Sequence, residues 1–329
     1  MQDFRFVIVG SGNMGSTYAR ILDKLPGMEL VSTVSRSGRR PADVPEAVPC
    51  VPSLAEVAVP FDGVIAATPN GLHRAVAVEA ARLGKHVLTE KVLDVTAEAM
   101  DAMIAACRQA GVKLGVTFQR RMSPDNQVMK RLLDEGALGR VFAADLVVKF
   151  YRDQAYYDSA PYRGDRTIDG GGPFIQQGAH NVDVYAWFFG LPAKVVSALG
   201  TFCHEMEGED HGAALLKYDN GMVGTIIAST ACKPGFPARL EIHAQKGTVV
   251  LENDAITVWE VDGMENPSAT GDTKIHSGAA SAAVSDTSGH EAIIADFVQA
   301  VREDHDPIVP GEDARRATDL ILRIYRSTI

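Results

Sequence analysis

The 329-residue sequence contains only four cysteines, and its formal net charge is −10. The cysteines (Cys50, Cys107, Cys203 and Cys232) form no Cys-x-x-Cys pair, which fits a reducing compartment and argues against a structural zinc site or a disulfide framework. The acidic balance and the lack of a basic block argue against a nucleic-acid groove. We therefore expect no nucleic-acid partner.

Long apolar runs are also absent. No stretch approaches the roughly 20 apolar residues that a membrane-spanning helix needs. The N-terminus enters "FRFVIVG" directly, without the basic segment, apolar run and small-residue cleavage site of a secretory signal. The histidines outside the motifs described below show no metal-ligand spacing. We expect a cytoplasmic protein with no membrane partner and no metal.

The first third of the chain alternates short apolar runs with amphipathic helical patterns. Short apolar runs predict strands, and a 3.6-residue apolar period predicts the helices between them. The expected strands cover residues 4–10, 29–35, 63–68, 86–90 and 112–118, and the expected helices cover residues 13–25, 73–84 and 97–111. Thr96 is the expected N-cap of the last of these helices. The alternation predicts a parallel, doubly wound sheet, which we assign to a Rossmann dinucleotide-binding domain of residues 1–121.

After residue 121 the pattern changes to β-runs with few helices between them. A hairpin is expected around Asp219–Gly221, and residues 238–261 continue as a meander. Helices are expected after Pro124, through "HNVDVYAWFFG", and near residues 290–303 and 312–327, with a long loop at 263–288. Residues 122–329 therefore predict a second α/β domain with an open, mostly antiparallel sheet, and its closing helices can pack back on the first domain.

The first expected strand leads into a glycine-rich turn, "GSGNMG", which opens the first helix. Glycines in a G-x-G-x-x-G spacing permit a tight turn, close approach of a pyrophosphate and close helix–strand packing, and the phosphates meet the helix N-terminus. The strand–turn–helix context is the one that the motif requires, although a glycine-rich turn without a ligand has the same pattern. The expected cofactor contacts in this turn are Gly10, Ser11, Gly12, Asn13, Met14 and Gly15.

The end of the second strand bears on which dinucleotide is bound. NAD-preferring sites usually carry Asp or Glu there to bind the ribose 2′-hydroxyl, whereas this sequence has Ser35, Arg36 and Ser37. Two hydroxyls and a guanidinium suit a 2′-phosphate through charge-assisted hydrogen bonds. We expect NADP(H) to be preferred, with NAD(H) as the other cofactor; the alternative interpretation is that Arg36 is a solvated loop charge.

Several stretches together resemble one family. The glycine turn is followed by "ATPNGLH" at residues 67–73, "EKV" at 90–92 and "DGGGPFIQQGAHNVD" at 169–183. This set is similar to the glucose–fructose oxidoreductase / inositol dehydrogenase family (Gfo/Idh/MocA), and the similarity extends through "FQRRMSP" at 118–124 to the closing helices. Members pair a Rossmann domain with a C-terminal α/β domain built on an open, largely antiparallel sheet. The motifs are specific to the family and not to a substrate.

The resemblance implies roles for individual residues. Those implied to border the cofactor are Thr68, Pro69, Asn70, His73, Glu90, Lys91 and Gln119. Glu90 and Lys91 correspond to the family's Glu-Lys-Pro element, in which the lysine points at the nicotinamide and the substrate hydroxyl. His180 corresponds to the histidine at the catalytic end of the substrate domain. The stretch "YYDSAPYRGD" resembles a Tyr-rich segment of a subset of members, some of which act on nucleotide sugars, and this makes Arg163 a candidate contact to cofactor or substrate.

Two departures from the family pattern lie beside these residues. The proline of the Glu-Lys-Pro element is Val92 here, and a lysine–valine bond reaches the cis conformation at higher cost than a lysine–proline bond, so the loop geometry after Lys91 can differ. Many members have Asp four residues before the histidine, where this chain has Gln176. If one helix covers both, Gln176 and His180 share a face. A glutamine cannot carry a proton, so it can only orient His180 or the substrate.

The chemistry of alcohol oxidation assigns these residues their expected tasks. The reaction removes a hydride and a proton; the cofactor takes the hydride, so the protein must supply the acid/base group. A lysine has a pKa near 10.4, which burial and the positive charge of an oxidised nicotinamide would lower toward neutral pH. We predict Lys91 as the proton donor and acceptor and His180 as the partner of a substrate hydroxyl or a proton relay. Arg163 and Gln176 complete the expected substrate contacts.

Structural alternatives exist for each of these residues. Lys91 can be a surface lysine, His180 can be a structural histidine that caps its helix, and His73 can cap the helix after Gly71. Asp183 is expected to anchor helix or loop backbone rather than to catalyse.

The sequence therefore favours an NAD(P)-dependent oxidoreductase that interconverts a secondary alcohol and a carbonyl on a sugar, polyol or sugar derivative. The alternatives are a dinucleotide-binding regulatory protein without catalysis, and a glycosidase of the same family that uses tightly held NAD. By resemblance, a homodimer or homotetramer is expected through the β-runs at residues 213–228 and 239–261.

Overall fold

The computed structural model describes residues 2–268 and 286–329, which form two compact units. Unit 1 consists of Met1–Phe118 and Thr287–Arg315, and unit 2 consists of Gln119–Asp286 and Arg316–Ile329. The expected boundary after residue 121 lies close to this division, and the chain returns to unit 1 near its end. Most of the loop expected at 263–288 lies outside the described residues.

Unit 1 is built on a six-stranded parallel sheet with the strand order β3-β2-β1-β4-β5-β6. The strands are β1 (Phe4–Val9), β2 (Met28–Val34), β3 (Cys50–Val51), β4 (Gly63–Ala66), β5 (His86–Thr89) and β6 (Leu114–Val116). The helices are α1 (Asn13–Lys24), α2 (His73–Arg82), α3 (Ala97–Ala110) and α7 (Ser288–Glu303), with short 3-10 turns η1 (Leu54–Glu56) and η2 (Asn70–Leu72). The doubly wound parallel sheet predicted from the sequence is confirmed.

The central strands of unit 1, β1, β4 and β5, are largely buried on both faces, which is why they read as apolar runs, whereas the first four residues of β2 are not buried. Every residue of β4 and β6 is buried. The helices begin and end where local chemistry predicts: Thr96 Oγ1 accepts a hydrogen bond from Ala99 N at 3.1 Å, and Gly111 ends α3 in the left-handed region at φ 66°. The two-residue strand β3 was not predicted, because two residues carry no periodicity.

Unit 2 is built on a seven-stranded sheet with the order β13-β12-β11-β7-β10-β9-β8. The strands are β7 (Val141–Lys149), β8 (Lys194–Gly200), β9 (His211–Lys217), β10 (Val223–Ser229), β11 (Arg239–Ala244), β12 (Gly247–Glu252) and β13 (Ala255–Val261). The helices are η3 (Gln119–Met122), α4 (Pro124–Asp134), α5 (Gln154–Asp158), α6 (Ala179–Phe189) and α8 (Gly311–Arg326), the last of which begins in unit 1. Among the described strands of this second sheet, only the β7–β10 pair is parallel. The mostly antiparallel sheet predicted for this domain is therefore confirmed.

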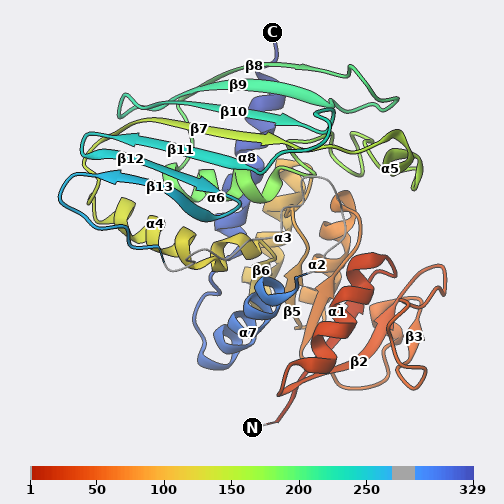
Figure 1. Ribbon diagram of the computed structural model, residues 1–329. Helices are drawn as coiled ribbons and strands as arrows, with labels where there is room; N and C mark the ends of the chain where they lie inside the picture. Colours follow the sequence, from red (N-terminus) through yellow and green to blue (C-terminus); the bar gives the residue numbers. More distant parts are fainter. Residues whose placement is uncertain (1, 269–285) are drawn as a thin grey trace. The chain divides into compact units, whose positions relative to one another are not determined.

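This sheet has one covered face. Figure 1 shows the seven strands as one layer with α6 along one side, where α6 packs against β7. Residues of β9 alternate between buried and exposed, as expected for a strand with one solvated face. Elements of this unit that were not predicted include α5 and β8: α5 is a single short turn, and β8 exposes much of its length, so neither carries a strong apolar pattern.

Candidate functional site

The turn between β1 and α1 is shaped by three glycines with different neighbours. A Cβ on Gly10, which has φ +123°, would lie 2.3 Å from the Ala67 carbonyl oxygen, and a Cβ on Gly15 would lie 2.3 Å from the Gly10 oxygen. These two glycines allow the backbone to pack against β4 and against itself. A Cβ on Gly12 would meet no atom within 4 Å among the described residues. Gly12 therefore faces open space, which suits close approach of a ligand.

The N-terminus of α1 is also suited to an anion. Gly12 is its N-cap and provides no side-chain hydrogen bond, and the first turn, which starts with Asn13 and Met14, contains no acidic residue. The backbone N–H groups of a helix start and the helix dipole together favour a phosphate. With the space at Gly12, the residues present fit the pyrophosphate of a dinucleotide.

Hydroxyl groups gather at the end of β2. Ser35 is buried, and its Oγ lies 3.4 Å from Ser11 Oγ and 3.1 Å from Ser37 Oγ. Arg36 is exposed and makes no hydrogen bond or ion pair with residues 2–268 or 286–329. By contrast, the Arg40 guanidinium donates to backbone carbonyls of its own loop. Of these two arginines, Arg36 is the one that a phosphate could recruit.

Lys91 is the second residue after β5, at the carboxyl edge of the parallel sheet where ligands of doubly wound folds bind. Residues 89–94 are buried with one exception, Lys91, which is partly exposed. The peptide bond between Lys91 and Val92 is cis, although position 92 is not a proline. The surrounding burial means that this segment presents one side chain, that of Lys91, outward.

The Glu90 side chain is buried and has partners within unit 1. Its carboxylate accepts a hydrogen bond from the Tyr18 hydroxyl, and its Oε2 accepts another from Lys91 N at 3.1 Å. Burial and the nearby Glu90 charge raise the pKa of Tyr18 well above its usual value, so Tyr18 remains a neutral donor. Glu90 thus orients the Lys91 backbone, and Tyr18, 72 residues away in the sequence, was missed by sequence reasoning.

The loop after β4 contains Thr68 and Pro69, which are partly exposed, and Asn70, which is buried at the start of η2. The ring of His73 is fully buried; its Nδ1 lies 2.8 Å from the Val92 oxygen and its Nε2 lies 2.9 Å from the Thr68 oxygen. Both ring nitrogens contact protein carbonyls rather than facing a ligand. His73 therefore supports this loop from beneath.

In unit 2, His180 is the second residue of α6 and is partly exposed. Gln176 lies in the turn before α6, which begins at Ala179. One helix therefore does not cover both residues, and the condition for a shared helical face is not met. Gln176 Nε2 instead donates to the Asp169 carboxylate and to the Asp169 carbonyl at 3.1 Å. The amide therefore holds the loop that leads into the helix.

The same loop is packed against the segment before β9. A Cβ on Gly172 would lie 1.7 Å from the Glu209 carbonyl oxygen, and Glu209 Oε2 accepts a hydrogen bond from Gly172 N at 3.1 Å. Burial raises the pKa of Glu209, although hydrogen bonds from Tyr325 and from backbone amides oppose the rise. Only glycine fits at position 172, so backbone packing determines where the segment before His180 runs.

Arg163 lies over an aromatic ring near the start of the same region. Its guanidinium is 4.0 Å from the Tyr156 ring centroid, and the Tyr156 hydroxyl accepts a hydrogen bond from Gln177 Nε2 at 3.2 Å. A guanidinium stacked in this way is oriented by the ring while its edge can still bind a ligand. Tyr156 and Gln177 are contacts that the sequence motif alone did not identify.

The structure also shows the surroundings of Asp183 and Gln119, two further residues named from the sequence. Asp183 is fully buried in α6 and forms a two-point ion pair with Arg121, at 2.8 Å to Nε and 2.6 Å to Nη2. Asp183 therefore anchors α6 to the side chain of Arg121 in η3. Gln119, the first residue of η3, is partly exposed, and its Oε1 is buried without a hydrogen-bond partner among the described residues.

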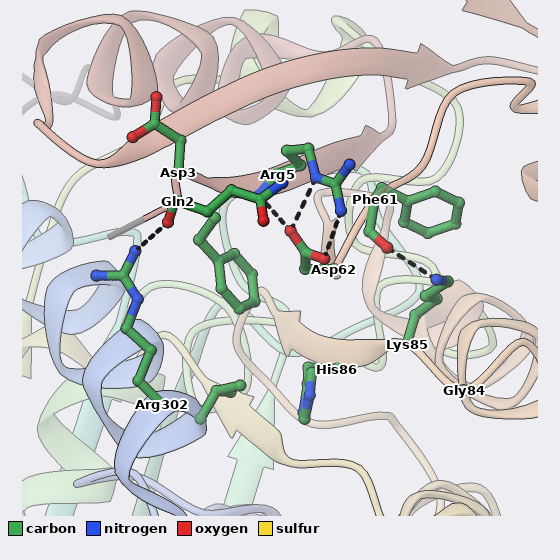
Figure 2. A pocket seen from close by; sticks show the side chains of 11 residues that line it. Gln2, Asp3, Arg5, Phe61, Asp62, Gly84, Lys85, His86 and Arg302 are labelled. Carbon is green, nitrogen blue, oxygen red and sulfur yellow. Dashed lines mark hydrogen bonds and ion pairs between the residues drawn. The ribbon is translucent and has the colours of Figure 1, made fainter.

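A separate cavity of about 360 Å³ lies in unit 1. It is lined by Phe4 and His86, the first residues of β1 and β5, so it lies at the opposite end of the sheet from the glycine turn. Of its charged groups, Figure 2 shows Arg5, Asp62 and Lys85 already engaged: Arg5 pairs with Asp62 at 3.0 and 3.1 Å, and Lys85 donates to a backbone carbonyl at 2.8 Å. We do not assign the dinucleotide to this cavity.

The described residues contain no cluster of three or more His, Cys, Asp or Glu side chains that could hold a metal ion. Among the helices within residues 2–268 and 286–329, none is both long and apolar enough to cross a membrane.

Two family models match the chain in sequence. Residues 4–118 match the family described as "Oxidoreductase family, NAD-binding Rossmann fold", and residues 126–250 match the GFO/IDH/MocA C-terminal domain. Together these matches cover most of the chain: the first spans the sheet of unit 1, and the second spans the sheet of unit 2 from β7 into β12.

Individual relatives are named as sugar and polyol oxidoreductases. The chain is 26% identical to an inositol 2-dehydrogenase of Rhizobium meliloti, covering 80% of this chain and 81% of the relative. It is 27% identical to a scyllo-inositol 2-dehydrogenase (NADP(+)) of Bacillus subtilis, covering 79% and 70%. Its fold is similar to that of the WlbA dehydrogenase from Bordetella pertussis, solved with NADH and UDP-GlcNAcA, with a TM-score of 0.84, 28% identity and coverage of 99% and 96%.

Proposed function

Because the chain belongs to the Gfo/Idh/MocA oxidoreductase family, and is thus an NAD(P)-dependent dehydrogenase or reductase, we propose that it interconverts a secondary alcohol and a carbonyl on a sugar, polyol or sugar derivative with Lys91 as acid/base. One observation supports the assignment of Lys91 as the acid/base. It is the partly exposed side chain of the otherwise buried segment 89–94, at the same edge of the parallel sheet as the glycine turn.

The proposed roles follow from the groups available. A nicotinamide supplies or accepts the hydride when it is bound. Lys91 Nζ takes the proton from the substrate hydroxyl during oxidation and returns it during reduction. His180 binds a substrate hydroxyl or relays the proton, Gln176 holds the loop that precedes it, and Arg163 contacts the substrate.

NADP(H) is the proposed preferred cofactor. The hydroxyls of Ser35 and Ser37, the exposed Arg36 and the lack of an acid at the end of β2 support binding of a 2′-phosphate. Relatives are named with either cofactor, since the Bacillus enzyme carries NADP(+) in its name and the Bordetella complex contains NADH. Thermal-shift titrations with NADPH and NADH test the preference, because tighter binding stabilises the folded state more. A larger shift with NADH would contradict it.

The substrate class is tested with a panel of inositols, aldoses, sugar acids and UDP-sugars. Turnover of each compound is measured from the change in absorbance as NADPH is formed or consumed. The names of the relatives motivate the inositols and UDP-linked sugars in the panel. Turnover of at least one compound is the expected result. Cofactor binding without turnover of any compound would favour the regulatory alternative.

We also propose a homodimer or homotetramer through the open sheet of unit 2. Its solvated face carries exposed apolar side chains in register, with Val196 opposite Leu215 on neighbouring strands, at 48% and 52% exposure. Exposed apolar patches of this kind are typical of association surfaces. A monomeric mass in light scattering would contradict the proposal.

A further inference from the structure

The segment that carries Lys91 is held by side-chain contacts on both sides. Before it, Glu90 accepts hydrogen bonds from Tyr18 of α1 and from the Lys91 amide. After it, Asp94 Oδ2 accepts a hydrogen bond from the backbone N–H of Arg74, in the first turn of α2, at 3.1 Å. Lys91 therefore lies between two anchored carboxylates, each bound to a different helix.

His73 adds a contact of a different kind, because it reaches a second loop. Its Nδ1 lies 2.8 Å from the carbonyl oxygen of Val92, the residue after Lys91, and its Nε2 lies 2.9 Å from that of Thr68. Val92 follows β5 and Thr68 follows β4, and these strands are neighbours in the sheet. One side chain therefore joins the lysine segment to the loop expected to border the cofactor.

The chemistry of this contact makes the two loops depend on each other. Carbonyl oxygens only accept hydrogen bonds, so a neutral imidazole with one N–H donates to one of these loops, and only an imidazolium donates to both. His73 is fully buried, so its ring cannot turn to water for another partner. A displacement of either loop therefore changes the hydrogen bonding of the other.

We propose that His73 is a positioning residue that couples the cofactor loop, residues 68–70, to the placement of Lys91. The proposal rests on the proposed function in that it takes residues 68–70 to border the dinucleotide and Lys91 to transfer the proton. A bound dinucleotide fixes the Thr68 carbonyl, and His73 transmits that constraint to Val92 and so to Lys91. Misplacement of a catalytic group by about 1 Å costs about 100-fold in rate, so the coupling has a measurable effect.

His73→Gln tests the coupling, because an amide retains a donor but cannot reach both carbonyls in the same geometry. We expect kcat to fall about 10- to 100-fold and the Kd for NADP(H) to rise together with it, since a residue that links two loops affects both parameters. The pH profile of kcat should also shift, because Lys91 is displaced. A purely structural role would lower thermal stability without moving that profile.

Two matched variants separate coupling from loss of a side chain. His86→Gln removes a partly buried histidine of the same unit, whose Nδ1 accepts a hydrogen bond from Lys113 N at 3.0 Å, and should leave kcat and Kd unchanged. Tyr18→Phe removes the hydroxyl that donates to Glu90 and leaves both contacts of His73 in place, so kcat should fall while the Kd for NADP(H) stays near the wild-type value. A His73→Gln variant with unchanged kcat, or with lowered kcat and unchanged Kd, would overturn the coupling.

Hydrogen–deuterium exchange of the wild-type protein gives an independent answer that needs no substrate and no variant. NADP⁺ should slow exchange in peptides that cover residues 68–70 and also in those that cover 92–95. Protection at 68–70 without any change at 92–95 would refute the coupling even if His73→Gln does not fold. Because this experiment requires only cofactor binding, it also separates a failure of the coupling from a failure to find any turnover.

Discussion

Lys91 and His180, the two residues proposed to act on the substrate, lie on segments that are held in different ways. The Lys91 segment is held by side chains that come from other parts of unit 1, namely Tyr18 and His73. The segment before His180 is held at Gly172 by backbone packing against the Glu209 carbonyl, where no Cβ fits, and closer to the helix by the bond from Gln176 to Asp169. The comparison indicates that removal of a side chain can loosen the first segment, whereas the second is disturbed by an atom added at Gly172.

The largest expected effect concerns the helix that carries His180. Asp183→Ala leaves the buried guanidinium of Arg121 without its two-point partner, and loss of one member of a buried ion pair costs about 3–5 kcal/mol. We expect this loss in the free energy of unfolding measured by chemical denaturation. Asp219→Ala, in the exposed turn between β9 and β10, is the control and should change stability by less than about 0.5 kcal/mol.

Gly172→Ala breaks the backbone contact before His180. Because the added Cβ would lie 1.7 Å from the Glu209 oxygen, we expect a loss of about 1–3 kcal/mol of stability. The displaced loop should also lower kcat, whereas the Kd for NADP(H) should stay unchanged, because the glycine turn lies in unit 1. Wild-type stability of this variant would show that the segment is not held by its backbone.

Gly12→Ala is the matching change in unit 1. It should weaken cofactor binding and have little effect on the stability of the fold. Its Cβ meets no described atom within 4 Å, so the fold should persist with at most the loss of about 1 kcal/mol expected at an N-cap. The methyl group instead occupies space proposed for the pyrophosphate, and we expect the Kd for NADP(H) to rise about tenfold or more, equivalent to about 1.4 kcal/mol. Unchanged affinity would place the dinucleotide elsewhere.

The smallest expected effect comes from the ion pair of Arg5 and Asp62 beside the cavity in Figure 2. Burial alone would raise the pKa of Asp62, but the hydrogen bonds and charge of Arg5 outweigh it and leave that pKa below its usual value. The resulting stability is present above the unfolded pKa, about 3.9, and is lost as pH falls through the folded pKa. We expect Asp62→Asn to cost about 0.2–1 kcal/mol at neutral pH and less in acid.

The sequence predicted the parts of the site that depend on local pattern. The glycine turn, the position of Lys91 after a buried strand and the hairpin at 219–221 each have a short-range signature, and the structure contains each of them. Contacts between residues far apart in the chain could not be predicted in this way. The bond from Tyr18 to Glu90 spans 72 residues, and neither residue type signals the other.

The start of the helix that carries His180 shows a second limit on what the sequence can predict. Spacing alone allowed Gln176 and His180 to share a helix, but α6 begins at Ala179. The preceding turn is fixed by packing of Gly172 against Glu209 and by the bond from Gln176 to Asp169, which are tertiary contacts. Local propensity gave no signal for either contact, so the sequence left open whether the helix extends back to Gln176.

The central claim is that Lys91 transfers the proton, and the most direct test compares Lys91→Ala with the wild-type enzyme on a substrate that the panel identifies. We predict that kcat falls about 100- to 10,000-fold, the usual contribution of a general acid/base, while the Kd for NADP(H) changes by less than about threefold, within roughly 0.7 kcal/mol. Retention of wild-type turnover by Lys91→Ala would contradict the account.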